Sequence, residues 1–387
     1  MSLPKRRRLI ILTGVLVAAL ILPDWRFISR AATYPEQPIM AVNWYRPRVE
    51  VTGQPAPELP VAAPTNAKFA AALATVADYA AERHSTGLIV MHKGTIALEE
   101  YWQGYDRRSQ FNAMSMSKTI VGLLMGQAIA EGTIASLEEP AANYLPEWQR
   151  DERARITLRD LLYMQSGLRN ERSTTSPASD LVHLYIGSNV EKTALSIPSV
   201  RPPGEEFDYN NVNSQVLAIV LQRATGINYA NYLATRLWQP IGAQAASLWL
   251  DRSGGFPKTF CCLFATARDW ARIGELLRNQ GRWQNQSVIP PDWIAQMLKP
   301  SSLEATFGKH IWVKARTADY PNVETTATDA YLDPQAFHLD GRGLQRVFVM
   351  PSYELVIVRM GEQPDNWDDA VVSNTLAQAL ETAASQN

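Results

Sequence analysis

Ser115-Met116-Ser117-Lys118 opens an apolar stretch that runs to about Gly132. The spacing of apolar residues in this stretch predicts a helix, and the i, i+3 separation puts the Ser115 hydroxyl and the Lys118 amine on one face. Serine becomes a strong nucleophile when a neighbour takes its proton, and a neutral amine can do this. Burial and the positive end of a helix both favour the neutral amine. The stretch therefore predicts a nucleophile beside its base, with the Ser115 backbone N–H free to meet an oxyanion.

This spacing alone is a weak signal. The chain has nine lysines, so at a serine frequency of roughly 7% about 0.6 chance matches are expected, and Ser2 with Lys5 supplies one. A second stretch adds support, because a Pro-Gly turn delivers Tyr209 and Asn211 just before a helix expected from about residue 213. Tyr209 could relay a proton to a leaving group if a nearby ammonium lowers its pKa. The Asn211 amide could orient Lys118 or a substrate carbonyl.

Several other kinds of protein are excluded or disfavoured by composition. The 387 residues carry a net charge of -1, so no basic field is available for nucleic acid. The chain has no Walker phosphate loop, no H-E-x-x-H, no G-x-S-x-G and no G-x-G-x-x-G. Its five histidines are scattered, which favours structural roles. The two cysteines, Cys261 and Cys262, form no zinc set, and a buried thiol pair is favoured over a vicinal disulfide.

The N-terminal segment is typical of an export signal. Four basic residues, Lys5 to Arg8, precede an uncharged stretch from Leu9 to Leu22. This stretch is short for a membrane span, which favours a cleaved signal peptide, although an uncleaved anchor is the alternative. Ser29 and Ala31 form a small-x-small pair where cleavage could occur. Either outcome predicts a protein that is exported to the periplasm, with a membrane tether in the second case.

Periodicity along the body predicts one sheet with helices around it. Helical spacing is found in residues 66–83, 115–132, 156–164, 213–224, 229–237, 267–279 and 368–383. Strand character is found in residues 86–91, 95–101, 307–313, 344–350 and 354–360. Lys93-Gly94 between the first two strands predicts a β-hairpin. Strands at both ends with helices between them predict a sheet that the C-terminus completes, beside a helical region.

The expected domain organisation follows from these segments. It comprises a signal peptide or anchor at 1–31, a linker or surface wrap at 32–65, and a catalytic domain at 66–387, with an α/β part at about 66–135 and 300–387 and a helical part at about 136–300. The long body is consistent with one large composite domain.

In chain order, these motifs resemble the serine β-lactamase and DD-peptidase superfamily, specifically the class C β-lactamase-related serine hydrolases. Ser115 to Lys118 matches the family's first motif, and Tyr209-Asn210-Asn211 matches its Y-x-N motif. Residues 156–168, which end in Ser-Gly-Leu, and residues 265–272 resemble the family's flanking segments. The likeness covers about residues 66–385. It implies an α+β fold, in which helices flank an antiparallel sheet beside an all-α subdomain, with the active site between them.

The third family motif, K-T-G or H-x-G, is where the chain departs from the pattern. Its best match is Leu339-Asp340-Gly341, and leucine can neither carry charge nor donate a hydrogen bond. Strand alternation should point His338 and Arg342 to the other face unless a bulge intervenes, so neither is the favoured replacement. This argues against a competent β-lactamase. Relatives that lack this anion handle include esterases and 6-aminohexanoate dimer hydrolases, which the chain resembles in this respect.

The glycines after this position still suit a substrate-binding strand. Gly341 would let the backbone approach the substrate closely, and Gly343 is expected to line the same place. The Arg342 N–H is the expected second oxyanion donor, beside that of Ser115.

The sequence therefore predicts an exported serine hydrolase that cleaves a small ester or amide through an acyl-enzyme on Ser115. Lys118 with Tyr209 would move the proton and Asn211 would orient them, so no metal or organic cofactor is expected. A peptidoglycan DD-peptidase or β-lactamase of the same fold is one alternative, and a non-catalytic penicillin-binding-like module is another. The sequence predicts neither the acyl group nor the oligomeric state.

Overall fold

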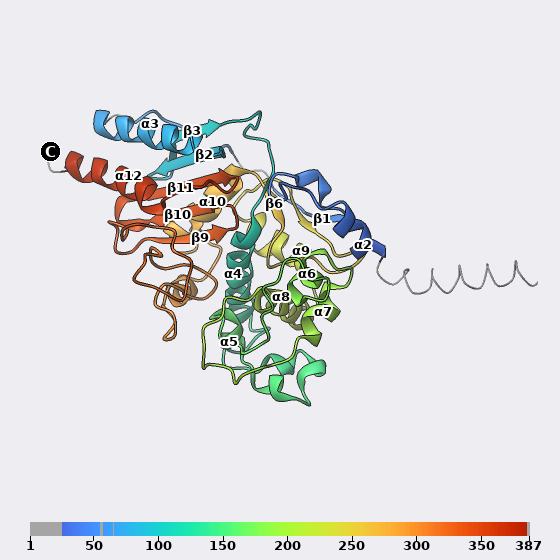
Figure 1. The fold of residues 1–387 in the computed structure, drawn as a ribbon. Helices are drawn as coiled ribbons and strands as arrows, with labels where there is room; N and C mark the ends of the chain where they lie inside the picture. The colour runs from blue at the N-terminus through green and yellow to red at the C-terminus, as the bar shows by residue number, and fades with distance from the viewer. Residues whose placement is uncertain (1–24, 55–56, 65, 385–387) are drawn as a thin grey trace, which may run out of the picture.

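The computed structural model describes residues 25–54, 57–64 and 66–384 (Figure 1). Most of the expected export segment, including Lys5 to Arg8 and the uncharged stretch to Leu22, lies outside the described residues. Within the described ranges, none of the helices has both the length and the apolar character needed to cross a membrane.

A five-stranded antiparallel sheet runs in the order β3-β2-β11-β10-β9 (Figure 1). Its strands are β2 (Ser85–His92), β3 (Thr95–Tyr101), β9 (Phe337–Gly341), β10 (Gln345–Met350) and β11 (Leu355–Gly361). β2 and β3 form the predicted hairpin, because Lys93 and Gly94 both adopt positive φ (53° and 76°), as a type I′ turn requires. β11 pairs with β2, so the C-terminal strands complete the sheet as predicted.

Helices cover both faces of this sheet. On one face, α3 (Ala67–Ala81) and α12 (Asp369–Ala384) lie side by side over it. Their apolar stripes share a core with alternate strand residues: Phe69, Leu73, Val76, Leu88, Val90, Phe348, Ile357 and Leu376. On the other face lies α10 (Ala267–Arg278). A Cβ at Gly274 would overlap Val356, so glycine permits this close approach.

The part of the molecule beside this sheet is mainly helical. Its helices are α4 (Ser117–Ala130), α5 (Leu158–Leu162), α6 (Asp180–Ile186), α7 (Val190–Ser196), α8 (Asn211–Thr225), α9 (Tyr229–Leu233), a π-helical turn (Ala234–Trp238) and α11 (Pro291–Met297). Short 3-10 helices occur at Val42–Trp44, Met114–Met116, Ala141–Asn143, Pro146–Trp148, Glu152–Arg155 and Pro351–Tyr353. α4 packs on α8 within the larger apolar core.

A second, smaller sheet lies beside these helices in the order β1-β5-β6-β4. It comprises β1 (Arg48–Val51), β5 (Ala246–Trp249), β6 (Leu263–Ala265) and β4 (Phe111–Asn112), and a separate ribbon joins β7 (Arg282–Trp283) to β8 (Gln286–Ser287). Helices and loops, without strands, were predicted between about residues 136 and 300, because strands of two to four residues are too short to show a period. β1 belongs to the segment expected as a linker, and it pairs with β5.

Two predicted helices begin where their sequences provide a capping box. Thr157 and Asp160 exchange side-chain and backbone hydrogen bonds at the start of α5, and Thr266 and Asp269 do the same at α10. Each box satisfies backbone N–H groups that the first helical turn would leave unpaired.

The strand predicted over residues 307–313 is wrong. Phe307 and Trp312 make only isolated bridges, to each other and from Trp312 to His338. These residues are apolar because Phe307 and Trp312 form a small buried cluster with Met164, and a buried cluster gives the same run of apolar residues as a strand.

Candidate active site

Ser115 lies on the 3-10 turn Met114–Met116, immediately before α4 begins at Ser117. The Met114 N–H donates to the Asn112 side chain (3.1 Å), and Met114 itself adopts a positive φ of 48°. This conformation is uncommon for a residue other than glycine and is often found at functional sites. The helix thus starts two residues later than the nucleophile, and Lys118 lies in its first turn.

The Lys118 amine lies within hydrogen-bonding distance of Ser115. Nζ is 2.8 Å from Ser115 Oγ, and it also donates to the Phe260 carbonyl oxygen at 2.8 Å. Lys118 is only 2% exposed, and this burial lowers its pKa to about 7, although the Asp340 carboxylate opposes the shift. A large fraction of the amine is therefore neutral near pH 7, as a base for Ser115 must be.

Tyr209 reaches the same place from the segment before α8. Asn210 caps that helix by accepting the Val212 N–H (3.2 Å), and its amide donates to the Leu168 carbonyl (3.3 Å). These bonds fix the backbone beside Tyr209.

The Tyr209 side chain meets both members of the reacting pair. It lines the same small cleft as Ser115, and its ring centroid is 5.1 Å from Lys118 Nζ. Burial raises the pKa of the Tyr209 phenol well above its ordinary value, and the Asp340 charge adds to this. A lowered Tyr209 pKa, as the sequence analysis envisaged, is thus not found. The group is a neutral phenol that can both donate and accept a hydrogen bond.

The third-motif strand, β9, presents Asp340 to the site. Leu339 is fully buried in the core on the opposite face, as strand alternation requires, while Asp340 lines the cavity that contains Ser115. A Cβ on Gly341 would overlap the Ala113 carbonyl oxygen, so the glycine lets β9 approach the turn that carries the nucleophile. Arg342 and Gly343 follow in the turn to β10 and line the same cavity.

The cavity at this site has a volume of about 420 Å³ and brings the predicted residues together. Ser115, Tyr209, Asn211, Gly341, Arg342 and Gly343 all line it, and Lys118 lies in a small cleft behind Ser115. Its apolar wall includes Leu181, Phe207, Trp312, Val323 and Leu344. The Tyr209 and Trp312 rings stack with their centroids 5.7 Å apart. This size and lining suit a small, partly apolar acyl group.

Two members of the site were missed at the sequence level. The Phe260 carbonyl provides the second partner of the Lys118 amine, a position for which Asn211 was considered, and a backbone oxygen leaves no residue-type signal. Asp340 was quoted only as the middle residue of the third motif and was given no role, because the site-facing position was assigned to Leu339. The structure reverses this assignment: Leu339 is buried in the core, and Asp340 and Arg342 line the cavity.

The residues that follow Phe260 also differ from expectation. Cys261 and Cys262 are joined by a disulfide, so the favoured thiol pair was wrong. Cys262 adopts a positive φ of 67° at this turn. A covalent link thus lies next to the carbonyl that binds Lys118.

The buried histidines near the site have structural contacts. His310 Nε2 is 2.8 Å from Ser214 Oγ and its Nδ1 is 2.9 Å from the Leu162 carbonyl oxygen, and burial lowers its pKa to about 3. Burial likewise lowers the pKa of His338 to about 3. In the part of the chain that the structure describes, no group of three or more His, Cys, Asp or Glu residues is arranged to hold a metal ion.

Comparisons with known proteins identify the family of this chain. The profile of the Beta-lactamase family matches residues 70–381. A 6-aminohexanoate-dimer hydrolase of Paenarthrobacter ureafaciens is 26% identical over 300 residues, covering 73% of this chain and 74% of the relative.

Solved structures show the same fold. A protein from Bacillus anthracis described as a candidate 6-aminohexanoate-dimer hydrolase superposes with a TM-score of 0.74 at 21% identity, covering 90% of this chain and 94% of that one. A family VIII carboxylesterase gives a TM-score of 0.63 at 16% identity, covering 83% and 98%. A penicillin-binding protein from Bacillus halodurans gives 0.59 at 14% identity, covering 80% and 99%.

Proposed function

Because the chain belongs to the Beta-lactamase family of serine hydrolases, we propose that it cleaves an ester or amide bond of a small acyl substrate through an acyl-enzyme on Ser115. The observation that carries the proposal is the 2.8 Å contact between Ser115 Oγ and Lys118 Nζ, combined with a Lys118 pKa of about 7. A nucleophile and a base matched to neutral pH are the two groups that acyl transfer needs first.

The proposed reaction proceeds in two halves. Ser115 Oγ attacks the carbonyl carbon while its proton passes to Lys118 Nζ, and the carbonyl oxygen becomes an oxyanion. The backbone N–H groups of Ser115 and Arg342 are the proposed donors to that oxyanion. The proton then moves by way of the Tyr209 hydroxyl to the leaving oxygen or nitrogen, whose bond to the carbonyl carbon breaks. In the second half, water takes the place of the leaving group and attacks the carbonyl carbon of the acyl-enzyme. Its proton returns through the same groups to Ser115 Oγ, and the acid is released.

The third-motif strand favours an esterase or amidase over a β-lactamase or DD-peptidase. Leu339 is buried, and the side chain that faces the cavity from this strand is a carboxylate, Asp340. The third-motif residues Leu339, Asp340 and Gly341 provide neither a cation nor a hydrogen-bond-donating side chain for the anionic group of a penicillin-like substrate. The names of the relatives, which include a 6-aminohexanoate-dimer hydrolase and a carboxylesterase, support the same order of preference.

Ester hydrolysis by matched serine variants tests the proposal. The full chain is expected to turn over p-nitrophenyl butyrate, and Ser115→Ala should lower kcat by at least about 10³-fold because the nucleophile is lost. Ser117→Ala is the matched control, since Ser117 is a buried serine two residues away whose hydroxyl accepts only a long bond from the Leu263 N–H (3.4 Å). Equal turnover by wild type and Ser115→Ala would refute the proposal.

The same preparation separates the alternatives. Hydrolysis of a chromogenic cephalosporin with efficiency similar to that for the ester would indicate a β-lactamase, and release of D-alanine from a peptidoglycan stem peptide would indicate a DD-peptidase. A folded protein that cleaves none of the three substrates would favour a non-catalytic binding module.

We also propose that the chain is exported and stays tethered to the inner membrane by its N-terminal segment. The support is the basic and apolar order of residues 5–22 and the way in which the following helix, α2 (Trp25–Ala32), joins the body. Arg30 is buried and donates to the Ile186, Gly187 and Asp251 carbonyls at 2.8 to 3.0 Å. Cleavage after Ala31 would remove these bonds.

Cell fractionation and N-terminal sequencing of the full chain test this location. The expected result is a membrane-associated protein whose N-terminus lies before Trp25. A soluble protein beginning at residue 32 would contradict the tether.

A further inference from the structure

Asp340 is the middle residue of the third motif, and it lies on β9 (Phe337–Gly341). Asp340 lines the substrate cavity, and it also lines the small cleft that Ser115, Lys118 and Tyr209 enclose. The side chain of Asp340 therefore shares this cleft with the reacting groups.

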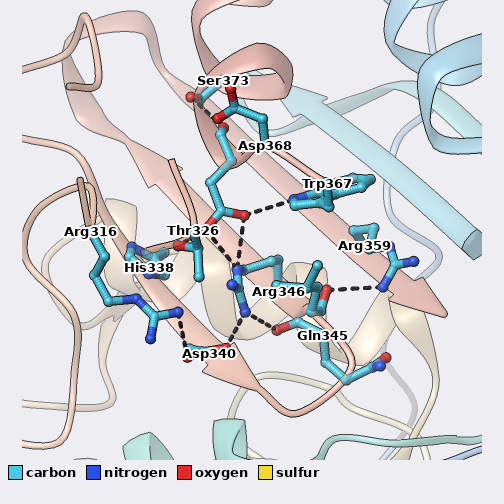
Figure 2. Close-up of polar contacts among 12 residues, drawn as sticks. Arg316, Thr326, His338, Asp340, Gln345, Arg346, Arg359, Trp367, Asp368 and Ser373 are labelled. Carbon is cyan, nitrogen blue, oxygen red and sulfur yellow. Dashed lines mark hydrogen bonds and ion pairs between the residues drawn. The ribbon is translucent and has the colours of Figure 1, made fainter. Parts of the chain in front are cut away.

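Two arginines hold this carboxylate in place. Arg316 Nη2 is 2.7 Å from Asp340 Oδ2, and Arg346 Nη1 pairs with the other oxygen, Oδ1 (Figure 2). Arg346 is fully buried, and its Nε binds Asp369 at 3.0 Å. Each oxygen of Asp340 thus pairs with one arginine. Arg346 also pairs with a second carboxylate, that of Asp369.

The two cations also keep Asp340 ionised. Burial alone would raise the pKa of this carboxyl group, but Arg316 and Arg346 outweigh burial and hold the pKa at about 2. The carboxylate is consequently a permanent, oriented negative charge across the whole range in which a hydrolase works. Figure 2 shows Asp340 between the guanidinium groups of Arg316 and Arg346.

We propose that Asp340 is a positioning residue of the hydrolase, whose fixed charge stabilises the Lys118 ammonium that forms when Ser115 gives up its proton. The inference rests on the proposed function. In that step the Ser115 O–H bond breaks and a Lys118 N–H bond forms, so a positive charge appears in a buried cleft. A fixed carboxylate in the same cleft lowers the cost of that charge.

The electrostatics of the neighbours agree with this role. The Asp340 charge raises the pKa of Lys118 against the dominant effect of burial, and it adds to the raised pKa of Tyr209. With the carboxylate present, Lys118 is a stronger base and Tyr209 holds its proton more firmly.

The two buried histidines near the cleft do not titrate in the range of Lys118. The ionisable groups around Lys118 and Asp340 are Arg172, Asp208, Tyr209, His310, Arg316, Glu324, His338, Arg342, Arg346 and Asp369. His310 and His338 have pKa values of about 3 and are neutral above about pH 5. Arg172 pairs with Asp208 at 2.9 Å, in the outer part of the cavity. The charge of His310 and His338 is therefore constant between about pH 5 and pH 9, so they do not contribute to a titration observed for Lys118 in that range.

The direct test measures the titration of Lys118 without requiring turnover. The full chain is labelled with [ε-¹³C]lysine, and the Lys118 signal is assigned from Lys118→Met and followed by NMR. Asp340→Asn should move the Lys118 midpoint down by about one pH unit, because an adjacent negative charge is lost. Arg316→Gln, which removes a cation and leaves the carboxylate, should move it up. Both variants break the Arg316–Asp340 ion pair. If Asp340 only supported the fold, the two variants would not be expected to shift the Lys118 midpoint in opposite directions.

Asp333→Asn is the matched control for loss of a buried carboxylate. Asp333 is 1% exposed, accepts from Ser352 Oγ at 2.7 Å, and does not line the cavity. It should leave the Lys118 midpoint unchanged, even if the protein becomes less stable.

The pH profile of ester hydrolysis then links the charge to the reaction. In Asp340→Asn the acidic limb of kcat/KM should follow the lower Lys118 midpoint, and the plateau should fall about tenfold, the rate factor that corresponds to a shift of one pKa unit. An unchanged Lys118 midpoint in both variants would overturn the inference, as would an NMR shift with an unchanged acidic limb. If the wild type shows no Ser115-dependent turnover, the proposed function fails while the NMR titration still decides whether Asp340 controls Lys118. If Asp340→Asn does not fold, the upward shift in Arg316→Gln decides the same question.

Discussion

Lowering the pH should switch off the hydrolase through one group, Lys118. Its pKa of about 7 leaves about 90% of the amine neutral at pH 8 and about 1% at pH 5. Since only the neutral amine can accept the Ser115 proton, kcat/KM should fall about 90-fold over this interval, with a midpoint at about pH 7. Activity falls with falling pH because burial lowers the Lys118 pKa. Lys118 therefore loses its proton several pH units below an ordinary lysine.

The assay is hydrolysis of p-nitrophenyl butyrate at constant ionic strength, read at the isosbestic wavelength of p-nitrophenol. Far-UV circular dichroism at each pH separates inactivation by protonation from acid unfolding. Lys118→Met supplies the control, because its residual rate should show no limb at this pH. His310 would not produce the limb, since its pKa is about 3.

A wild-type profile that is flat from pH 5 to pH 8 would refute this account of the base. A midpoint near that of an ordinary lysine, about pH 10, would also refute it, because it would mean that burial in the cleft does not lower the Lys118 pKa.

Three further predictions concern the framework of the site. Asn210→Ala should lower the free energy of unfolding by about 2 kcal/mol in urea titrations, because it loses the α8 cap and buried hydrogen bonds; a change below about 0.5 kcal/mol would contradict this. Gly126→Ala should cost about 3 kcal/mol in the same assay, since the added Cβ would overlap the Trp293 indole, and an unchanged midpoint would be inconsistent with that contact. Arg30→Met should speed limited proteolysis before β1 and leave ester turnover intact; equal cleavage rates would show that Arg30 does not hold α2.

The elements that the sequence predicted well carry local signals. Lys93-Gly94 provides a turn that fixes the β2–β3 hairpin, and the helical stripe of Phe69, Leu73 and Val76 fixes α3. The close pairing of Ser115 with Lys118 also follows from spacing alone, because residues three apart meet on one helical face.

The parts that were not predicted depend on contacts distant in the chain. The partner of Lys118 is a backbone carbonyl 142 residues away, and any residue type could provide it. The strand expected over residues 307–313 is a buried aromatic cluster, and a run of apolar residues does not distinguish the two. Asp340 is held in place and ionised by Arg316 and Arg346, which reach it from other segments.

The same dependence on contacts distant in the chain explains why the third motif was only partly predicted. The sequence showed that Leu339 replaces a cation, but the face on which each neighbour lies depends on how β9 pairs with β10. Only that register buries Leu339 and turns Asp340 towards Ser115.

Covalent trapping of the nucleophile tests the central claim most directly. The full chain is incubated with a fluorophosphonate, the intact mass is recorded, and the labelled peptide is sequenced by tandem mass spectrometry. The account predicts a single adduct on Ser115 in the wild type and in Ser117→Ala, with none in folded Ser115→Ala. An adduct on another residue, or undiminished labelling of Ser115→Ala, would contradict it.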